Sequence, residues 1–259
     1  MHDLGRSNYR LPRLSKMTPR RIARGVRRYA TMPFQSRFDR RVSAVVRTGE
    51  EGKHDLDVIR GFPEMNDPLK GSAWFGLERI GVELVRRFRP KVVVELGTHM
   101  GFSALAMGLQ LKANGDNARL YAVDTWEGEE HAGRYDESVY RTFLKRRSEL
   151  ELEATVVPLR MRFDEACPQI PTPIDLLHID GLHTWEAVAT DFATFGPLVR
   201  PGGLVLFHDV CSSWVDVRRF WDTLRPHYRT HTISHSNGLG ILEMPRQPSL
   251  YPNPQKPAV

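Results

Sequence analysis

The stretch KVVVELGTHMGFSAL, Lys91 to Leu105, decides the fold class of this chain. Its apolar run, Val92–Leu96, carries one acid and ends at Gly97, and a new apolar segment begins near Ser103. A strand-length apolar run followed by a short turn and a helix is typical of a parallel sheet that is buried on both faces. Because Gly97 and Gly101 lack a Cβ, we expect the backbone of this turn to approach a ligand closely.

The same alternation continues along the chain. It predicts a Rossmann-like, doubly wound α/β fold with a mostly parallel sheet. The segments flanking HSNG predict an antiparallel hairpin at the C-terminal end. The predicted strands are Val92–Leu96, Leu120–Asp124, Ala154–Leu159, Ile174–Asp180, Leu204–Asp209, Thr230–Ser234 and Leu239–Met244. The predicted helices are Ser103–Lys112, Ser138–Glu149, Thr184–Leu198 and Trp214–Leu224.

The positive charge of the chain is concentrated near its N-terminus. Thirteen of the 37 Lys and Arg residues fall within residues 1–49, where only two acids occur. We therefore predict a basic arm over 1–49, with a short amphipathic helix from Thr18, a domain over 50–244 and a Pro-rich tail over 245–259. The arm either attaches to an anionic surface or packs its narrow apolar stripe on its own domain. No specific nucleic-acid partner is expected, because the remainder of the chain is net acidic.

Cysteine content and hydropathy indicate a cytoplasmic protein. Cys167 and Cys211 form neither a disulfide framework nor a metal finger. No apolar run reaches the roughly 18 residues of a membrane-spanning helix. The arm could hold the protein at the periphery of a membrane surface, and an organelle transit peptide stays open as an alternative.

Four acids are predicted to meet at one edge of the sheet. The carboxyl ends of parallel strands share an edge, which is where open α/β sheets bind ligands. Glu95, Asp124, Asp180 and Asp209 all fall at such ends. The turn G-T-H-M-G lacks the G-x-G-x-x-G of dinucleotide-binding dehydrogenases, whereas Asp124 lies where an acid can accept hydrogen bonds from a ribose.

Longer motifs give a definite resemblance. VVVELGTHMGFS, YAVDTWEGEEHAGRY, FDEA, IDLLHIDGLHTWEAVATDF and LVRPGGLVLFHDV resemble the class I S-adenosylmethionine-dependent methyltransferases. The resemblance runs from about residue 72 to about residue 244. It is strongest to the branch that includes sugar and natural-product O-methyltransferases and bacterial glycan-modifying enzymes.

The resemblance implies a cofactor site for S-adenosylmethionine. In it, Glu95, Gly97 and Gly101 hold the amino-acid end of the cofactor, Asp124 holds the ribose, and Thr125 and Trp126 lie beside it. For Trp126, a place in the core or a lid stays open. The remaining implied cofactor-binding residues are Thr98, Ser103, and Arg162 and Phe163 beside the adenine.

The resemblance also implies a base and a metal. His183, three residues after Asp180, matches the position of a catalytic histidine, and imidazole titrates near neutral pH. Its alternative role is to cap the following helix. Asp180, His208 and Asp209 match a divalent-cation site in which His208 replaces an acid. This replacement should either shift the metal preference from Mg toward Mn or Fe, or end metal dependence. Alternatively, His208 and Asp209 only bond the next helix.

The expected activity is methyl transfer from S-adenosylmethionine to a hydroxyl of a sugar, a glycan or a glycosylated natural product. Two alternatives stay open: an iron-dependent hydroxylase on the same scaffold, and a non-catalytic cofactor-binding protein that docks through its arm. The sequence fixes neither the acceptor nor the oligomeric state.

Overall fold

A computed structural model describes residues 37–51, 72–129 and 133–246 of this protein. Its helices are α2 (Arg37–Glu51), α4 (Glu78–Phe88), α5 (Phe102–Asn114), α6 (Glu137–Glu149), α7 (Phe163–Ala166), α8 (Trp185–Phe195) and α9 (Val215–Leu224), with short 3-10 turns η2 (Cys167–Gln169) and η3 (Gly196–Leu198). Its strands are β1 (Val92–Leu96), β2 (Arg119–Asp124), β3 (Gly128–Glu129), β4 (Gly133–Arg134), β5 (Val156–Arg160), β6 (Ile174–Ile179), β7 (Val199–His208), β8 (Arg229–Ile233) and β9 (Leu239–Glu243).

A seven-stranded sheet runs through the centre of the molecule in the order β5-β2-β1-β6-β7-β9-β8. The first five of these strands are parallel, and β9 is antiparallel to both of its neighbours. The chain builds outward from β1 in one direction and then returns to add β6 on the other side. The order therefore reverses between β1 and β6, which creates the crevice where such sheets bind ligands.

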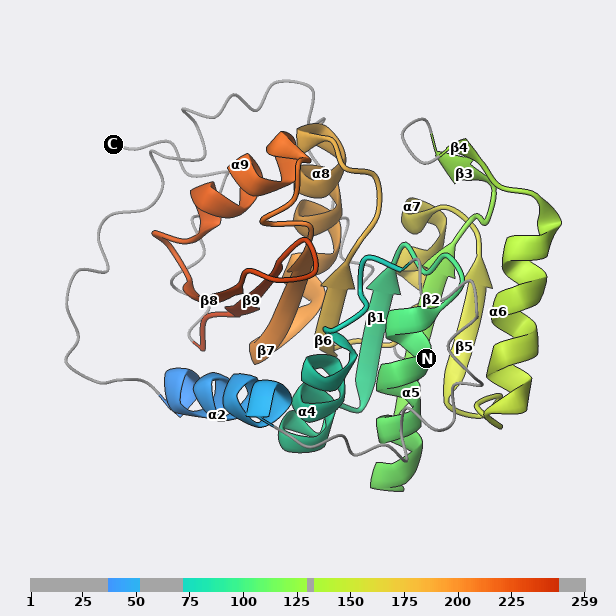
Figure 1. The fold of residues 1–259 in the computed structure, drawn as a ribbon, viewed down its shortest axis with the longest axis horizontal. Coiled ribbons are helices and arrows are strands. Elements are labelled where there is room, and N and C mark those ends of the chain that lie inside the picture. The colour runs from blue at the N-terminus through green and yellow to red at the C-terminus, as the bar shows by residue number, and fades with distance from the viewer. Residues whose placement is uncertain (1–36, 52–71, 130–132, 247–259) are drawn as a thin grey trace, which may run out of the picture.

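Helices cover both faces of the sheet (Figure 1). One face packs against α2, α4, α5 and α6, and the other packs against α7, α8 and α9. Strand residues alternate between the two faces because successive side chains point in opposite directions. In β1, for example, Val93 faces the first set of helices, whereas Val94 and Leu96 face the second. This two-sided burial explains why the strands read as apolar runs.

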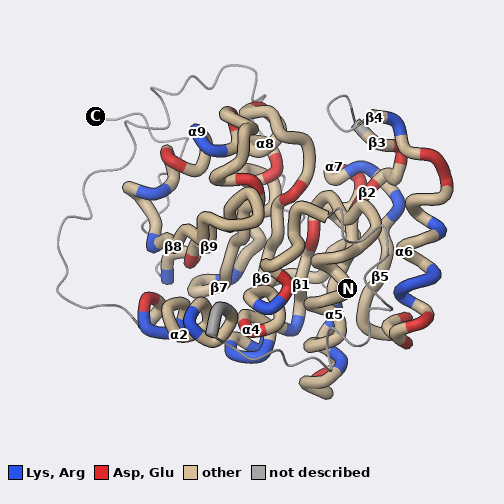
Figure 2. The backbone as a smooth tube through the Cα atoms, in the orientation of Figure 1, with Lys and Arg blue, Asp and Glu red and all other residues tan. Residues whose placement is uncertain are grey.

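The amphipathic helix α2 belongs to the folded body. Phe38, Val42 and Val45 recur on one side of it and are at most 2% exposed, packed in the same core cluster as α4. Arg41 lies over the ring of Phe88 at 3.9 Å and donates to a carbonyl of α4. Figure 2 shows Lys and Arg along the outer turns of these two helices. The boundary expected at residue 49 therefore falls inside α2.

The predicted strands and helices are present, with ends that differ by a few residues, except that β7 begins five residues earlier than expected. Helices α2 and α4, the β3–β4 pair and the short α7 were not predicted. The helix expected from Thr18 and nearly all of the Pro-rich tail lie outside the described residues. Within the described part of the chain, no helix is long and apolar enough to cross a membrane.

Candidate active site

Two glycines allow the turn after β1 to pack closely against neighbouring segments of the protein. Gly97 and Gly101 have φ angles of 89° and 85°, which favour glycine. A Cβ on Gly97 would overlap the backbone carbonyl of Asp180, and one on Gly101 would overlap the ring of Phe143. The glycines thus allow close packing of the turn on the β6 loop and on α6. The sequence analysis expected these glycines to leave space for a ligand. In the structure, an added Cβ at either position would first collide with protein atoms.

Asp124 ties this turn to the end of β2. Its Oδ2 accepts hydrogen bonds from the backbone N–H groups of Thr98 at 3.0 Å and His99 at 2.8 Å. Its Oδ1 accepts from the backbone N–H of Trp126 at 2.7 Å. An ionised carboxylate offers about four lone-pair sites. Asp124 can therefore organise the two loops and still accept a hydrogen bond from a ribose.

Trp126 is a buried aromatic that packs into the core at the edge of the candidate site. Its indole is 1% exposed, stacks on Phe143 at 5.3 Å and packs beside Tyr140 at 4.6 Å. Its Nε1 donates to the carbonyl of His99 at 2.6 Å. Of the roles that the sequence analysis left open for Trp126, a place in the core agrees with these contacts. Thr125, beside it, accepts a hydrogen bond from the backbone of Glu127.

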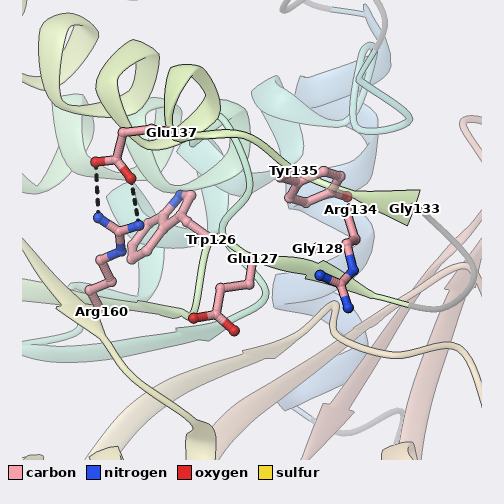
Figure 3. Close-up of a pocket in the computed structure, with 8 residues that line it drawn as sticks. All are labelled: Trp126, Glu127, Gly128, Gly133, Arg134, Tyr135, Glu137 and Arg160. Carbon is pink, nitrogen blue, oxygen red and sulfur yellow. Dashed lines mark hydrogen bonds and ion pairs between the residues drawn. The ribbon is translucent and has the colours of Figure 1, made fainter.

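A polar cavity of about 640 Å³ lies beyond the end of β2 (Figure 3). Arg160 crosses one side of it, paired with both carboxylate oxygens of Glu137 at 3.0 and 2.7 Å. The guanidinium also lies 4.5 Å from the centre of the Tyr140 ring. The cavity is lined by Trp126, Glu127, Gly128, Gly133, Arg134, Tyr135, Glu137 and Arg160.

The residues predicted beside the adenine lie outside this cavity. Arg162 is exposed and pairs with Asp164 at 3.0 Å. Phe163 begins α7, and its ring lies under Gly181, where a Cβ would contact it. Phe163 therefore borders the loop after β6, and its contact with an adenine stays a prediction.

A row of buried polar groups crosses the sheet on the face covered by α4 and α5. Glu95 and His178 are register partners on β1 and β6, both with fully buried side chains. His178 Nδ1 lies 2.9 Å from Glu95 Oε2. The edge of Trp74 packs on the imidazole, with ring centres 4.8 Å apart. Thr98 and Ser103, also predicted to bind cofactor, are buried nearby, in the turn and at the start of α5.

The loops after β6 and β7 bring the other predicted residues together. His183 Nε2 lies 2.8 Å from Asp209 Oδ2, and its ring stacks on Trp214 with centres 4.9 Å apart. His208 Nδ1 lies 3.0 Å from Asp180 Oδ1 and 3.2 Å from Asp209 Oδ2. The sequence placed all four of the acids and histidines here. It did not indicate Trp214.

The carboxylates hold His208 in its charged form. Burial alone would lower the pKa of His208, but Asp180 and Asp209 outweigh burial and raise the pKa to about 11. Burial would raise the pKa of Asp209, yet hydrogen bonds from His183 and His208 keep the pKa well below its usual range. His208 Nε2–H donates to the carbonyl of Ser236 at 3.1 Å, so both ring nitrogens of His208 face acceptors.

This arrangement bears on the predicted metal. His208 is less suited to the role of ligand, because its Nδ1 already contacts Asp180 and Asp209 and its Nε2 contacts the carbonyl of Ser236. Asp180, His183 and Asp209 do suit it, because one ligand atom from each lies within 4.8 Å of the others. Two carboxylates and one imidazole are acceptable ligands for Mn or Fe. The metal stays a prediction, with His183 rather than His208 as the better third ligand.

Two residues that sequence reasoning set aside or missed complete the site. The sequence analysis does not single out His178, yet this residue is bonded to the candidate cofactor residue Glu95. Trp74 reaches the same pair from the turn before α4. The signal for His178 was the alternation of β6, which places it on the same face as Asp180. Nothing in the sequence pointed to Trp74.

Comparisons with known proteins agree with this architecture. Residues 94–210 match the family described as a methyltransferase domain. The protein y4gI of Sinorhizobium fredii is 37% identical over 193 residues, which are 73% of this chain but 21% of that protein. The chain therefore spans about one fifth of the length of this relative.

Solved methyltransferases share the fold at low sequence identity. The methyltransferase PaMTH1 of Podospora anserina, solved with S-adenosylhomocysteine, has a TM-score of 0.55 at 15% identity and covers 83% of this chain and 98% of its own. TomG of Streptomyces achromogenes, an O-methyltransferase solved with S-adenosylmethionine, has a TM-score of 0.52 at 16% identity and covers 80% and 90%. Residues 94–210 thus match a methyltransferase-domain model, and the described chain shares the fold of these two solved methyltransferases.

Proposed function

We propose that this protein transfers a methyl group from S-adenosylmethionine to a hydroxyl oxygen of a sugar, a glycan or a glycosylated natural product. The observation that carries the reaction type is the contact of His183 with Asp209 at the carboxyl edge of the sheet, beside the loop that packs on Gly97. The acceptor class is supported by the resemblance of the HIDGLH and FHD motifs to enzymes that modify sugars.

His183 would act as the general base. Asp209 Oδ2 accepts a hydrogen bond from Nε2–H at 2.8 Å, so Nδ1 is the nitrogen that takes the proton of the acceptor hydroxyl. Asp209 also stabilises the imidazolium formed in this step, as the acid does in a catalytic triad. The stacked ring of Trp214 limits rotation of the imidazole. Both contacts fix the base before the acceptor arrives, which lowers the entropy cost of the reaction.

The turn and strand ends would hold the cofactor. When bound, the cofactor supplies a methyl group that is already activated on a sulfonium. Glu95 and the turn from Gly97 to Gly101 would hold its amino-acid end, and Asp124 would accept from its ribose. Asp180 and the loop after β6 would face the acceptor, because Asp180 directly contacts the turn through its backbone.

A metal-assisted reaction is the second candidate, favoured by the spacing of Asp180, His183 and Asp209. In that arrangement His183 would bind the cation, and the cation rather than a base would lower the pKa of the acceptor hydroxyl. The two candidates give His183 incompatible roles, since Nε2 cannot both donate to Asp209 and bind a metal.

The test is to incubate the protein with methyl-labelled S-adenosylmethionine and a panel of sugars and glycans, and to identify the labelled product by mass spectrometry. His183→Gln should lower kcat by about 100-fold or more if His183 is the base. His227→Gln, at the other end of α9, is the matched control and should leave the rate unchanged. A variant His183→Gln with full activity would refute the base. Labelling of proteins or aromatic phenols instead of sugars would refute the acceptor class.

A further inference from the structure

Several buried polar atoms around the Glu95–His178 pair have no hydrogen-bond partner among the described residues. They include Glu95 Oε1, His178 Nε2, Thr98 Oγ1 and Trp74 Nε1. A buried polar atom without a partner costs about 1–3 kcal/mol. Their concentration at the ends of β1 and β6, next to the turn, indicates a place where a ligand supplies the missing partners.

The direction of the Glu95–His178 hydrogen bond follows from chemistry. A carboxylate oxygen accepts hydrogen bonds, so Nδ1 is assigned as the donor to Glu95 Oε2 at 2.9 Å. This leaves Oε1 as the oxygen that a ligand can use. Trp74 packs against the imidazole in a T-shaped arrangement, with ring planes at 70°.

The chemistry of Glu95 Oε1 indicates which part of the cofactor it would bind. Glu95 is fully buried and lies two residues before Gly97. A buried carboxylate oxygen is best satisfied by a cationic donor. The amino-acid end of S-adenosylmethionine offers an ammonium group, whereas the adenosine end offers no cation.

We propose that His178 is a positioning residue for the cofactor: it orients Glu95 so that Oε1 receives the ammonium group of the amino-acid end. The inference rests on the proposed use of S-adenosylmethionine. If His178 merely filled the core, its replacement would loosen the whole site and weaken every part of the cofactor alike. If it acts through Glu95, the loss is confined to ligands that carry the amino group.

Two variants, His178→Asn and His178→Gln, distinguish these two roles of His178, because both introduce an amide and they differ only in length. The side-chain nitrogen of Asn can occupy the place of Nδ1, whereas that of Gln reaches the place of Nε2. His178→Asn should therefore keep the donor to Glu95, and His178→Gln should lose it. Leu176→Ala, a control on the same face of β6 and 1% exposed, loosens the core without touching the hydrogen bond.

The measurement is calorimetric titration of each variant with S-adenosylhomocysteine, its decarboxylated analogue and 5′-methylthioadenosine, which has no amino-acid part. His178→Gln should bind the first two ligands about tenfold to 100-fold more weakly, because hydrogen bonds to charged groups contribute about 1.5–3 kcal/mol. Binding of 5′-methylthioadenosine should change less than twofold. His178→Asn should restore most of the affinity, and Leu176→Ala should affect all three ligands equally.

A double variant gives an independent test. In Glu95→Gln protein, adding His178→Gln should weaken S-adenosylhomocysteine binding no further, since the two residues act as one unit. Equal losses on all three ligands, or no loss in His178→Gln, would overturn the role of His178 while leaving the cofactor in place. Failure of the wild-type protein to bind S-adenosylhomocysteine would overturn the proposed cofactor, and this inference with it.

Discussion

The buried acid Asp191 on α8 should make stability depend on pH. Asp191 is 8% exposed, and its carboxyl lies under the loop after β6, where a Cβ on Gly181 would be 3.5 Å from Oδ2. Burial raises the pKa of Asp191 from 3.8 to about 7. The group is therefore neutral in the folded protein at mildly acidic pH and must ionise in a buried place at alkaline pH.

The sign and size of the effect follow from this shift. Because the folded pKa exceeds the unfolded one, Asp191 weakens the folded state progressively as pH rises from about 4 to about 7, and the loss is complete above that. Each pKa unit corresponds to ~1.4 kcal/mol, so the full penalty is on the order of 4 kcal/mol. Asp191→Asn, which keeps the shape and removes the charge, should remove the penalty.

The assay is urea unfolding of wild type and Asp191→Asn at pH 5, 6, 7 and 8. The variant should gain stability over the wild type steadily from pH 5 to pH 7 and keep the full gain at pH 8. Asp222→Asn, on the exposed side of α9, is the matched control and should leave the pH profile unchanged. A gain for Asp191→Asn that is constant across this range, or absent at pH 8, would refute the reasoning.

Four further outcomes are expected. Asp209→Asn should lower kcat by about 100-fold while cofactor affinity changes only a few-fold, since Asp209 acts through the base; equal losses in both would contradict this. EDTA should leave wild-type activity intact, and loss restored by Mn would favour the metal. Gly97→Ala should lower the thermal midpoint and cofactor affinity together, because the new Cβ meets a backbone oxygen. Deletion of residues 1–36 should preserve the fold and weaken binding to anionic vesicles, whereas deletion of 1–51 should destabilise the domain.

The central strands β1, β2, β6, β7 and β9 were predictable because they are buried on both faces. Each of them gives a short apolar run in the sequence. The end of such a run marks the carboxyl end of the strand, which is where Asp124 and Asp180 lie. The residues of helix α2 were placed in a separate arm and not predicted as a helix, although the spacing of its three buried positions carried the signal. The β3–β4 pair could not be predicted, because two-residue strands show no alternation.

The sequence predicted which acids and histidines lie near one another, but it did not predict which side chains contact each other. Alternation and strand ends place Glu95, Asp180 and Asp209 at one edge. Which histidine faces which acid depends on loop conformation: Asp209 has a positive φ of 61°, which no local pattern announces. The family resemblance suggested His208 as a metal ligand, which stays a prediction; the structure engages both of its nitrogens and brings His183 to Asp209.

The contact between Gly97 and the carbonyl of Asp180 has a consequence for protein engineering. Two loops from different strands touch through their main chains, so neither can be exchanged for a homologous loop of another shape on its own. A chimaera that imports a foreign acceptor loop after β6 should also import the matching turn after β1. The two segments form a single module for recombination, although about eighty residues separate them in the chain.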